Sequence, residues 1–210
     1  MSVIGQTSNA LLIHSFRDRS LYEPSQKEAI NSTYAKPGDD QPVKVTYGPG
    51  FFDAYHNLDG VEFSYGFNLA YNGSDKASRL ASTAAAACKK LGPSSLRLSE
   101  LGNEPDFYTG LPNWARPPGW NLSQYVEDWN MQARVAANAM KENCPGQDVG
   151  FISPSFIWTN FTGAPPWNPA EAFALGLDTS LIKEIAGHKY GSTLKYYASS
   201  LIDADMLLVI

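Results

Sequence analysis

Apolar and polar residues alternate most regularly along residues 61–69. The apolar positions of this stretch are Val61, Phe63, Tyr65, Phe67 and Leu69. An alternation of this kind is typical of a strand with one covered face. Further stretches of strand length and apolar character occur at residues 96–103, 149–155 and 181–188. The pattern therefore predicts four strands between residues 61 and 188.

The segments between these strands have helical periodicity. Residues 76–91 follow the capping sequence Asn72–Asp75 and end at a Gly-Pro pair, and residues 122–143 begin after Asn121. Asn121 and Gln124 have the spacing of a capping box. Shorter helices are expected at residues 49–58 and 170–175. Helices and strands thus alternate along the chain.

This alternation predicts an α/β protein whose strands are parallel and joined by right-handed crossovers. The polar loops that follow the strands are long, and these loops lie on the catalytic face of such folds. Residues 1–48 give a weaker signal. The apolar run 10–16 has no clear period, and residues 17–47 are expected to cross the surface as a long polar segment.

Composition restricts the classes of partner. The chain has 210 residues, of which 43% are hydrophobic, and its net charge is −5. It has no basic run, which argues against nucleic acid and against anionic membranes as partners. No apolar stretch approaches the roughly 20 residues of a membrane span. No signal peptide is visible at the N-terminus.

Two features bear on the cellular compartment. Four glycosylation sequons occur, at Asn31, Asn72, Asn121 and Asn160. Cys88 and Cys144 are the only cysteines, each at the end of a predicted helix. The sequence allows a disulfide between them if the two helices are neighbours, and it favours two buried free thiols at least as much.

The predicted strand at residues 96–103 ends in the sequence Gly-Asn-Glu-Pro. Pro105 cannot donate to a sheet ladder, and it disfavours helix at Glu104, so the strand stops there. Glu104 is therefore expected at the carboxyl end of a strand, where α/β sheets keep their chemistry. A carboxyl group there, beside the amide of Asn103, suits proton transfer to a substrate oxygen.

The other strand ends supply Asn68, His188 and Tyr190 as candidate site residues. The chain has no glycine-rich nucleotide motif, no nucleophile elbow and no cluster with metal-ligand spacing, so no cofactor is expected. One carboxylic acid among amides, aromatic rings and a histidine suits a sugar. Glu100 and Glu184 lie inside strands and are interpreted as structural carboxylates.

The segment Leu101–Tyr108 resembles the acid/base motif of glycoside hydrolase family 79, the heparanase and fungal β-glucuronidase group of clan A. Further similar segments are Arg17–Pro24, Val61–Leu69, Ala87–Gly92 and Gly187–Tyr190. The resemblance implies a (β/α)8 TIM barrel, of which this chain carries roughly strands 2 to 6 with their helices. It also implies retaining hydrolysis of a β-glucuronide by a secreted parent protein.

By the same resemblance Glu104 is the proton donor, and Asn103 bonds the 2-hydroxyl of the sugar. Asn68, His188 and Tyr190 are expected to bind substrate. The family's nucleophilic Glu ends its seventh strand, so residues 1–210 are expected to be a partial catalytic barrel. Such a chain would lack the nucleophile and the C-terminal β-domain, and would be inactive and poorly soluble alone.

Two other interpretations fit the sequence. The chain could be a non-catalytic carbohydrate-binding or vestigial protein, with tryptophans that stack on sugars, or a clan A enzyme of other specificity such as a glucanase. The tryptophans concerned are Trp114, Trp120, Trp158 and Trp167. In every case the expected partner is a carbohydrate, and no obligate protein partner is evident.

Overall fold

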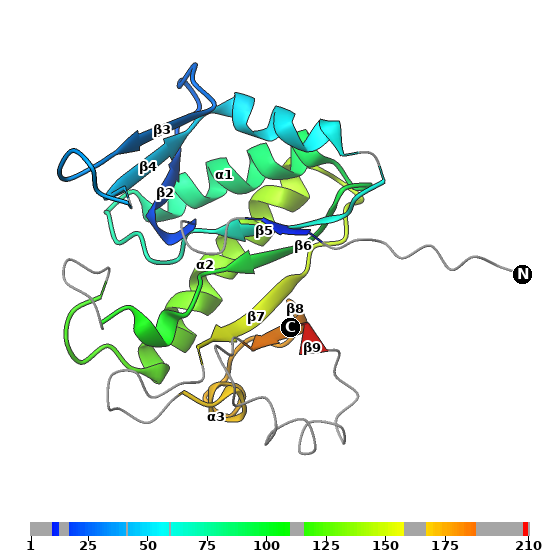
Figure 1. Ribbon diagram of the computed structural model, residues 1–210. Helices are drawn as coiled ribbons and strands as arrows, with labels where there is room; N and C mark the ends of the chain where they lie inside the picture. Colours follow the sequence, from blue (N-terminus) through cyan, green and yellow to red (C-terminus); the bar gives the residue numbers. More distant parts are fainter. Residues whose placement is uncertain are drawn as a thin grey trace, which may run out of the picture.

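The structure is a computed structural model that describes residues 10–12, 17–40, 42–58, 60–109, 116–157, 167–187 and 208–209. Within these ranges, one sheet has the strand order β1-β5-β6-β7-β8-β9 (Figure 1). Every neighbouring pair in it is parallel. Its strands are β1 Ala10–Leu12, β5 Phe63–Phe67, β6 Leu96–Leu101, β7 Phe151–Phe156, β8 Ile182–Gly187 and β9 Leu208–Val209.

Helices lie between successive strands of this sheet. α1 (Lys76–Leu91) joins β5 to β6, α2 (Leu122–Asn143) joins β6 to β7, and α3 (Pro169–Ala174) joins β7 to β8. Figure 1 shows α1 and α2 side by side against the sheet. The predicted parallel α/β architecture is therefore confirmed. It is the arrangement from which a (β/α)8 barrel is built, although the described strands do not by themselves close a barrel.

The long helices begin and end where the sequence predicts. At the start of α2 the Asn121 side chain accepts from the Gln124 N–H at 3.2 Å, and the Gln124 side chain accepts from the Asn121 N–H at 3.0 Å. This reciprocal pair is the predicted capping box. α1 ends at Leu91, and its C-cap is Gly92, whose φ is 73°. The predicted short helix at residues 49–58 is the 3-10 helix η2 (Pro49–Asn57).

The N-terminal segment contains a second sheet that the sequence pattern did not predict. Its strands are β2 (Ser20–Tyr22), β3 (Ile30–Thr33) and β4 (Lys44–Tyr47), in the order β2-β4-β3. All four residues of β3 are exposed. The segment does cross the surface, as expected, but strands of three or four mixed residues are too short to give a readable alternation.

A disulfide joins Cys88 to Cys144, with a Cα–Cα distance of 6.2 Å. Cys88 lies in the last turn of α1, and Cys144 is the C-cap of α2. Helices that follow successive parallel strands run in the same direction, so their carboxyl ends meet. The alternative of two free thiols is therefore wrong.

The core lies mainly between the sheet and the helices. Trp129 of α2 is fully buried against Phe151 of β7, with ring centroids 5.8 Å apart. A smaller apolar cluster of Leu98, Ile152 and Ala186 is separate from this core. No helix among the described residues is long and apolar enough to cross a membrane.

Candidate active site

Glu104 lies directly after β6, in a turn that continues into the 3-10 helix η3 (Pro105–Phe107). Its φ of 52° and ψ of 53° make it the only non-glycine residue with positive φ in the described part of the chain. Such a conformation is costly for a residue with a Cβ and often marks a functional position. The Glu104 N–H donates to the carbonyl of Ser155 in β7 at 3.0 Å, which fixes the turn against the next strand.

The glycine before this turn is required by its surroundings. Gly102 has a φ of 83°, and a Cβ there would lie 2.8 Å from the hydroxyl of Tyr108 and 2.9 Å from Leu69. The Gly102 N–H also donates to the carbonyl of Phe67 at 3.0 Å. Only glycine allows this close approach between the ends of β5 and β6. The glycine of the Gly-Asn-Glu sequence is thus required by the packing of the turn.

Asp18, in the 3-10 helix η1 (Arg17–Arg19), joins the ends of both strands. One carboxylate oxygen accepts from the N–H groups of Leu69 and Ala70 at 3.1 and 3.3 Å. The other oxygen accepts from the Asn103 N–H at 2.7 Å and the Tyr108 hydroxyl at 2.8 Å. The sequence patterns gave no reason to single out Asp18, and only its place in the Arg17–Pro24 segment could have drawn attention to it.

Arg116 contacts the same loop after β5 through its carbonyls. Its guanidinium donates to Leu69 O at 2.9 Å and to Ala70 O at 2.8 Å, and it forms an ion pair with Asp128 of α2. It is buried and lies 4.7 Å from the ring centroid of Trp120. The peptide groups of residues 69–70 are therefore bonded on one side by a carboxylate and on the other by a guanidinium.

Asp106 attaches the turn that follows Glu104 to the end of β7. Both of its carboxylate oxygens lie 3.1 Å from the backbone nitrogen of Ile157, which donates to them.

Burial raises the pKa of Tyr125, and the nearby carboxylates Asp106 and Glu100 raise it further. The Tyr125 hydroxyl lies 3.1 Å from that of Ser153. This tyrosine therefore stays neutral beneath the turn.

The predicted site residues fall into three groups. Asn103 and Glu104 lie together, both half-buried, at the end of β6. Asn68 is oriented differently, because its amide donates to Ser20 O at 3.0 Å and accepts from the Tyr71 N–H at 2.7 Å. His188 and Tyr190 lie outside the described residues.

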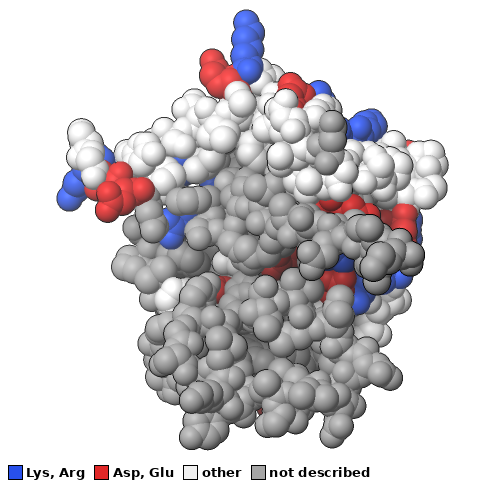
Figure 2. Space-filling model, turned by 45° about the vertical axis from the view of Figure 1, so that its right-hand side comes forward, with Lys and Arg blue, Asp and Glu red and all other residues white. Residues whose placement is uncertain are grey.

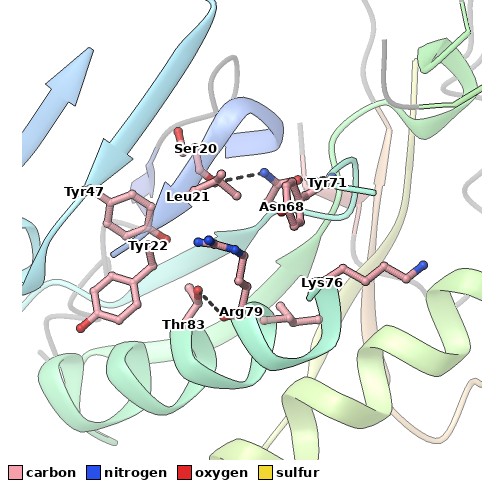
Figure 3. Close-up of a pocket in the computed structure, with 10 residues that line it drawn as sticks. Ser20, Leu21, Tyr22, Tyr47, Asn68, Tyr71, Lys76, Arg79 and Thr83 are labelled. Carbon is pink, nitrogen blue, oxygen red and sulfur yellow. Dashed lines mark hydrogen bonds between the residues drawn. The ribbon is translucent and has the colours of Figure 1, made fainter. Parts of the chain in front are cut away.

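Asn68 lines a small cavity between β2 and α1 (Figure 3). The cavity has a volume of about 20 Å³, which suits one water molecule and is too small for a sugar ring. A larger hollow of about 470 Å³ lies beside Trp120 and the start of α2. The residues that line it include Asn72, Lys76 and Gln124.

The two carboxylates interpreted as structural are both inside strands. Glu100 is fully buried in β6. Glu184 of β8 forms an ion pair with Arg97, and this hydrogen bonding raises the pKa of Arg97. Among the described residues, no group of three or more His, Cys, Asp and Glu side chains could bind a metal ion.

Of the four tryptophans named above as candidates for stacking on a sugar, Trp120 and Trp167 are described, and both pack against neighbouring side chains. The Trp120 indole N–H donates to the carbonyl of Pro105 at 3.3 Å. The Trp167 ring lies 5.7 Å from Tyr125 and 5.5 Å from Phe156, centroid to centroid. Trp114 and Trp158 lie outside the described residues.

Figure 2 shows the described Lys and Arg side chains interspersed with Asp and Glu.

Sequence comparison identifies two fungal relatives, while no family model matches the chain. A protein of Aspergillus niger is 35% identical over 168 residues, which are 78% of this chain and 30% of the relative. A protein of Neurospora crassa is 34% identical over 184 residues, 83% of this chain and 32% of the relative. Both relatives are beta-glucuronidases. The chain spans about a third of their length.

Structural comparison agrees on the fold. A crystal structure of a 4-O-α-L-rhamnosyl-β-D-glucuronidase from Fusarium oxysporum, in complex with Rha-GlcA, matches with a TM-score of 0.66. The match covers 87% of this chain and 36% of that enzyme, at 23% identity. The fungal relatives support the prediction of a glycoside hydrolase of beta-glucuronidase type, and this structure supports the parallel α/β fold.

Proposed function

We propose that the chain is the part of a beta-glucuronidase-type glycoside hydrolase that carries the proton donor, Glu104. The observation that supports this most directly is the position of Glu104. It is half-buried directly after a parallel strand, in a left-handed conformation bonded to the next strand. The similarity to fungal beta-glucuronidases supports the choice of reaction.

The proposed reaction is retaining hydrolysis in the manner of glycoside hydrolase family 79. Glu104 protonates the glycosidic oxygen as the bond to the leaving group breaks, and later removes a proton from the attacking water. Asn103 bonds the 2-hydroxyl of the sugar, where hydrogen bonds strengthen in the transition state. His188 and Tyr190 complete the proposed substrate contacts, whereas the amide of Asn68 is engaged by Ser20 and Tyr71 and is no longer proposed to contact the sugar.

A retaining mechanism also needs a nucleophilic carboxylate about 5–5.5 Å from the acid. Among the described residues, Glu100 is fully buried and Glu184 is paired with Arg97, so neither suits this role. We therefore propose that neither of these two strand carboxylates is the nucleophile and that the chain alone has negligible turnover. Residues 1–210 would then form part of a single catalytic barrel.

A second candidate, non-catalytic sugar binding, is favoured by one observation. The hollow beside Trp120 has a volume of about 470 Å³ and amide side chains in its lining, which would accept a monosaccharide. The packing of Trp120 on Arg116 and Pro105 weakens this alternative, because the indole is already engaged.

One titration separates the two candidates. The 15N-labelled chain is titrated with methyl β-D-glucuronide, and its α-anomer is the matched control. Amide shifts at Asn103 and Glu104 that require the β-anomer are the expected result. Shifts centred on the Trp120 indole would support the second candidate instead, and the absence of any shift would contradict both.

A turnover assay tests the proposal that Glu104 is the catalytic acid and that the chain alone is inactive. The chain and its Glu104→Gln variant are incubated with 4-nitrophenyl β-D-glucuronide, and release of 4-nitrophenol is followed. Equal, background release from both is expected for the chain alone. Release that the variant abolishes would show that the chain is active, and would still support Glu104 as the acid.

We also propose that the parent protein is secreted. The Cys88–Cys144 disulfide is typical of oxidising compartments. Asn31, Asn72 and Asn121, three of the sequon asparagines, are exposed and so accessible to glycosylation. Expression in a eukaryotic secretory host, followed by glycosidase treatment and mass measurement, tests this; a secreted chain with no glycan would contradict the glycoprotein assignment.

A further inference from the structure

Asp18 is distant in sequence from the candidate acid, yet its carboxylate lies among the backbone groups on both sides of it. It accepts hydrogen bonds from the backbone N–H groups of Leu69, Ala70 and Asn103 and from the hydroxyl of Tyr108. Asn103 directly precedes Glu104, and Tyr108 ends the turn that follows it. Leu69 and Ala70 directly follow Asn68.

We propose that Asp18 is a positioning residue that sets the conformation of the Asn103–Glu104 turn for the sugar. The inference rests on the proposed function, since it takes Glu104 as the acid and Asn103 as a sugar ligand. Asp18 itself does not touch the reacting atoms in this account. It acts through the Asn103 N–H, which lies 2.7 Å from its carboxylate and is the shortest of these four hydrogen bonds.

The chemistry of the contacts calls for a carboxylate at this position. Three of the four groups that point at Asp18 are backbone N–H groups, which can only donate. An ionised carboxylate offers two oxygens that only accept, whereas an asparagine would turn an NH2 group toward one pair of donors. Hydrogen bonds to a charged acceptor are also about twice as strong as neutral ones.

The contacts explain how a strained residue is retained. The left-handed conformation of Glu104 is unfavourable for a residue with a Cβ and persists only where surrounding groups fix it. Here Ser155 bonds its N–H, while Asp18 bonds the residue before it and the hydroxyl of Tyr108. Loss of the Asp18 contacts would remove the hydrogen bonds that tie Asn103 and Tyr108 to η1, on the side of the turn away from Ser155.

The test compares the full chain with two variants. Asp18→Asn is nearly isosteric, and it replaces one hydrogen-bond-accepting oxygen of the side chain by an NH2 group, which can only donate. Asp178→Asn is the control, because Asp178 also accepts from a backbone N–H, that of Ser180 at 3.1 Å, but lies before β8 and pairs with Arg134. Hydrogen exchange of the Asn103 amide and the affinity for methyl β-D-glucuronide are measured on each.

Asp18→Asn should increase exchange at Asn103 while the amide of Phe151, which donates to Leu181 O, stays protected. The dissociation constant for the sugar should rise about tenfold or more, since small displacements of positioned groups are costly. The control should change neither value. Unchanged protection of Asn103 in a folded Asp18→Asn variant would overturn the proposal, whether or not the sugar binds.

The experiment gives a different result if the proposed function is wrong. If the wild-type chain does not bind the sugar but Asp18→Asn still exposes the Asn103 amide, the ordering role stands and the glycosidase assignment falls. If Asp18→Asn does not fold, Tyr108→Phe is used, which removes only the hydroxyl donor to Asp18. Its Asn103 amide should exchange faster than in the wild type, and an unchanged rate would contradict the proposal.

Discussion

The helical layer and the loops at the carboxyl ends of the strands are stabilised in different ways. α1 and α2 bury small apolar side chains such as Ala84, Ala133 and Ala136 against the sheet, and one disulfide joins their ends. The loops are fixed by Asp18 and Arg116, whose side chains bond backbone groups more than 40 positions away in sequence. One region relies on apolar contact, the other on directed hydrogen bonds.

This difference has a consequence for function. Apolar burial is non-directional, and it tolerates small changes of shape. A hydrogen bond from a buried charge fixes a distance and an angle, and leaving one partner alone is costly. The geometry of the candidate site therefore depends on a few polar residues, whereas the stability of the layer beneath it is spread over many apolar ones.

The largest expected change in the free energy of unfolding comes from breaking the disulfide that joins the ends of α1 and α2. The Cys88–Cys144 bridge closes a loop with a sequence separation of 56, for which the chain-entropy model gives about 4 kcal/mol. Reduction should lower the free energy of unfolding by about this amount, as measured by urea denaturation. The matched control is the Cys88→Ala/Cys144→Ala variant, in which reductant should have no effect. A loss below about 1 kcal/mol would mean that apolar packing alone stabilises this layer.

The next effect tests the polar loops. Arg116→Met should lower the free energy of unfolding by about 3 kcal/mol, because it leaves two carbonyls and Asp128 without their guanidinium partner. Lys76 still pairs with Asp128 at 2.8 Å, which keeps the loss at the lower end of the usual range. Urea denaturation measures it.

Arg134→Met is the control for this variant. Arg134 also pairs with an aspartate, Asp178, but its side chain is 67% exposed. Exposed pairs contribute about 0–1 kcal/mol. If the two variants lose the same stability, the buried contacts of Arg116 are no more important than a surface ion pair, and the contrast between the two regions fails.

The same contrast explains what the sequence could predict. The helices α1 and α2 each bury one periodic face, and the strands β5 and β6 are buried almost throughout, so the apolar residues of these four elements carry the information. Glu104 could be placed because Pro105 stops a strand. Asp18, Arg116 and the orientation of Asn68 could not be predicted, since each depends on which backbone groups of distant segments meet at the end of the sheet.

A smaller effect concerns two buried tyrosines between the two sheets. The Tyr65 hydroxyl donates to Tyr47 at 2.8 Å. Burial raises the pKa of Tyr47 to about 12, and that of Tyr65 well above 10. The folded state therefore keeps these protons more tightly than the unfolded state, and the stability they contribute is complete below pH 10.

That stability is lost as the pH rises from 10 through 12. At pH 11 each tyrosine should cost about 1 kcal/mol relative to pH 8. Urea denaturation at the two pH values measures the loss, and Tyr47→Phe should reduce it. Tyr34→Phe, at a site 49% exposed, is the control and should leave it unchanged. Equal losses in both variants would show that the tyrosines between the sheets are not protected by burial.

The smallest effect lies where the two regions meet, at the N-terminus of α2. Asn121→Ala removes the capping box, and should lower the free energy of unfolding by about 1 kcal/mol. Asn121→Ser keeps a capping hydroxyl and should lose only a few tenths of that amount. Because Trp120, the neighbouring residue, contacts both Arg116 and Pro105, the amide exchange of Asn103 is measured in the same variants. Unchanged exchange at Asn103 would show that the N-terminus of α2 and the Glu104 turn are stabilised independently. Faster exchange would show that the hydrogen bonds to Asp18 and Ser155 do not fix the turn unless α2 is capped.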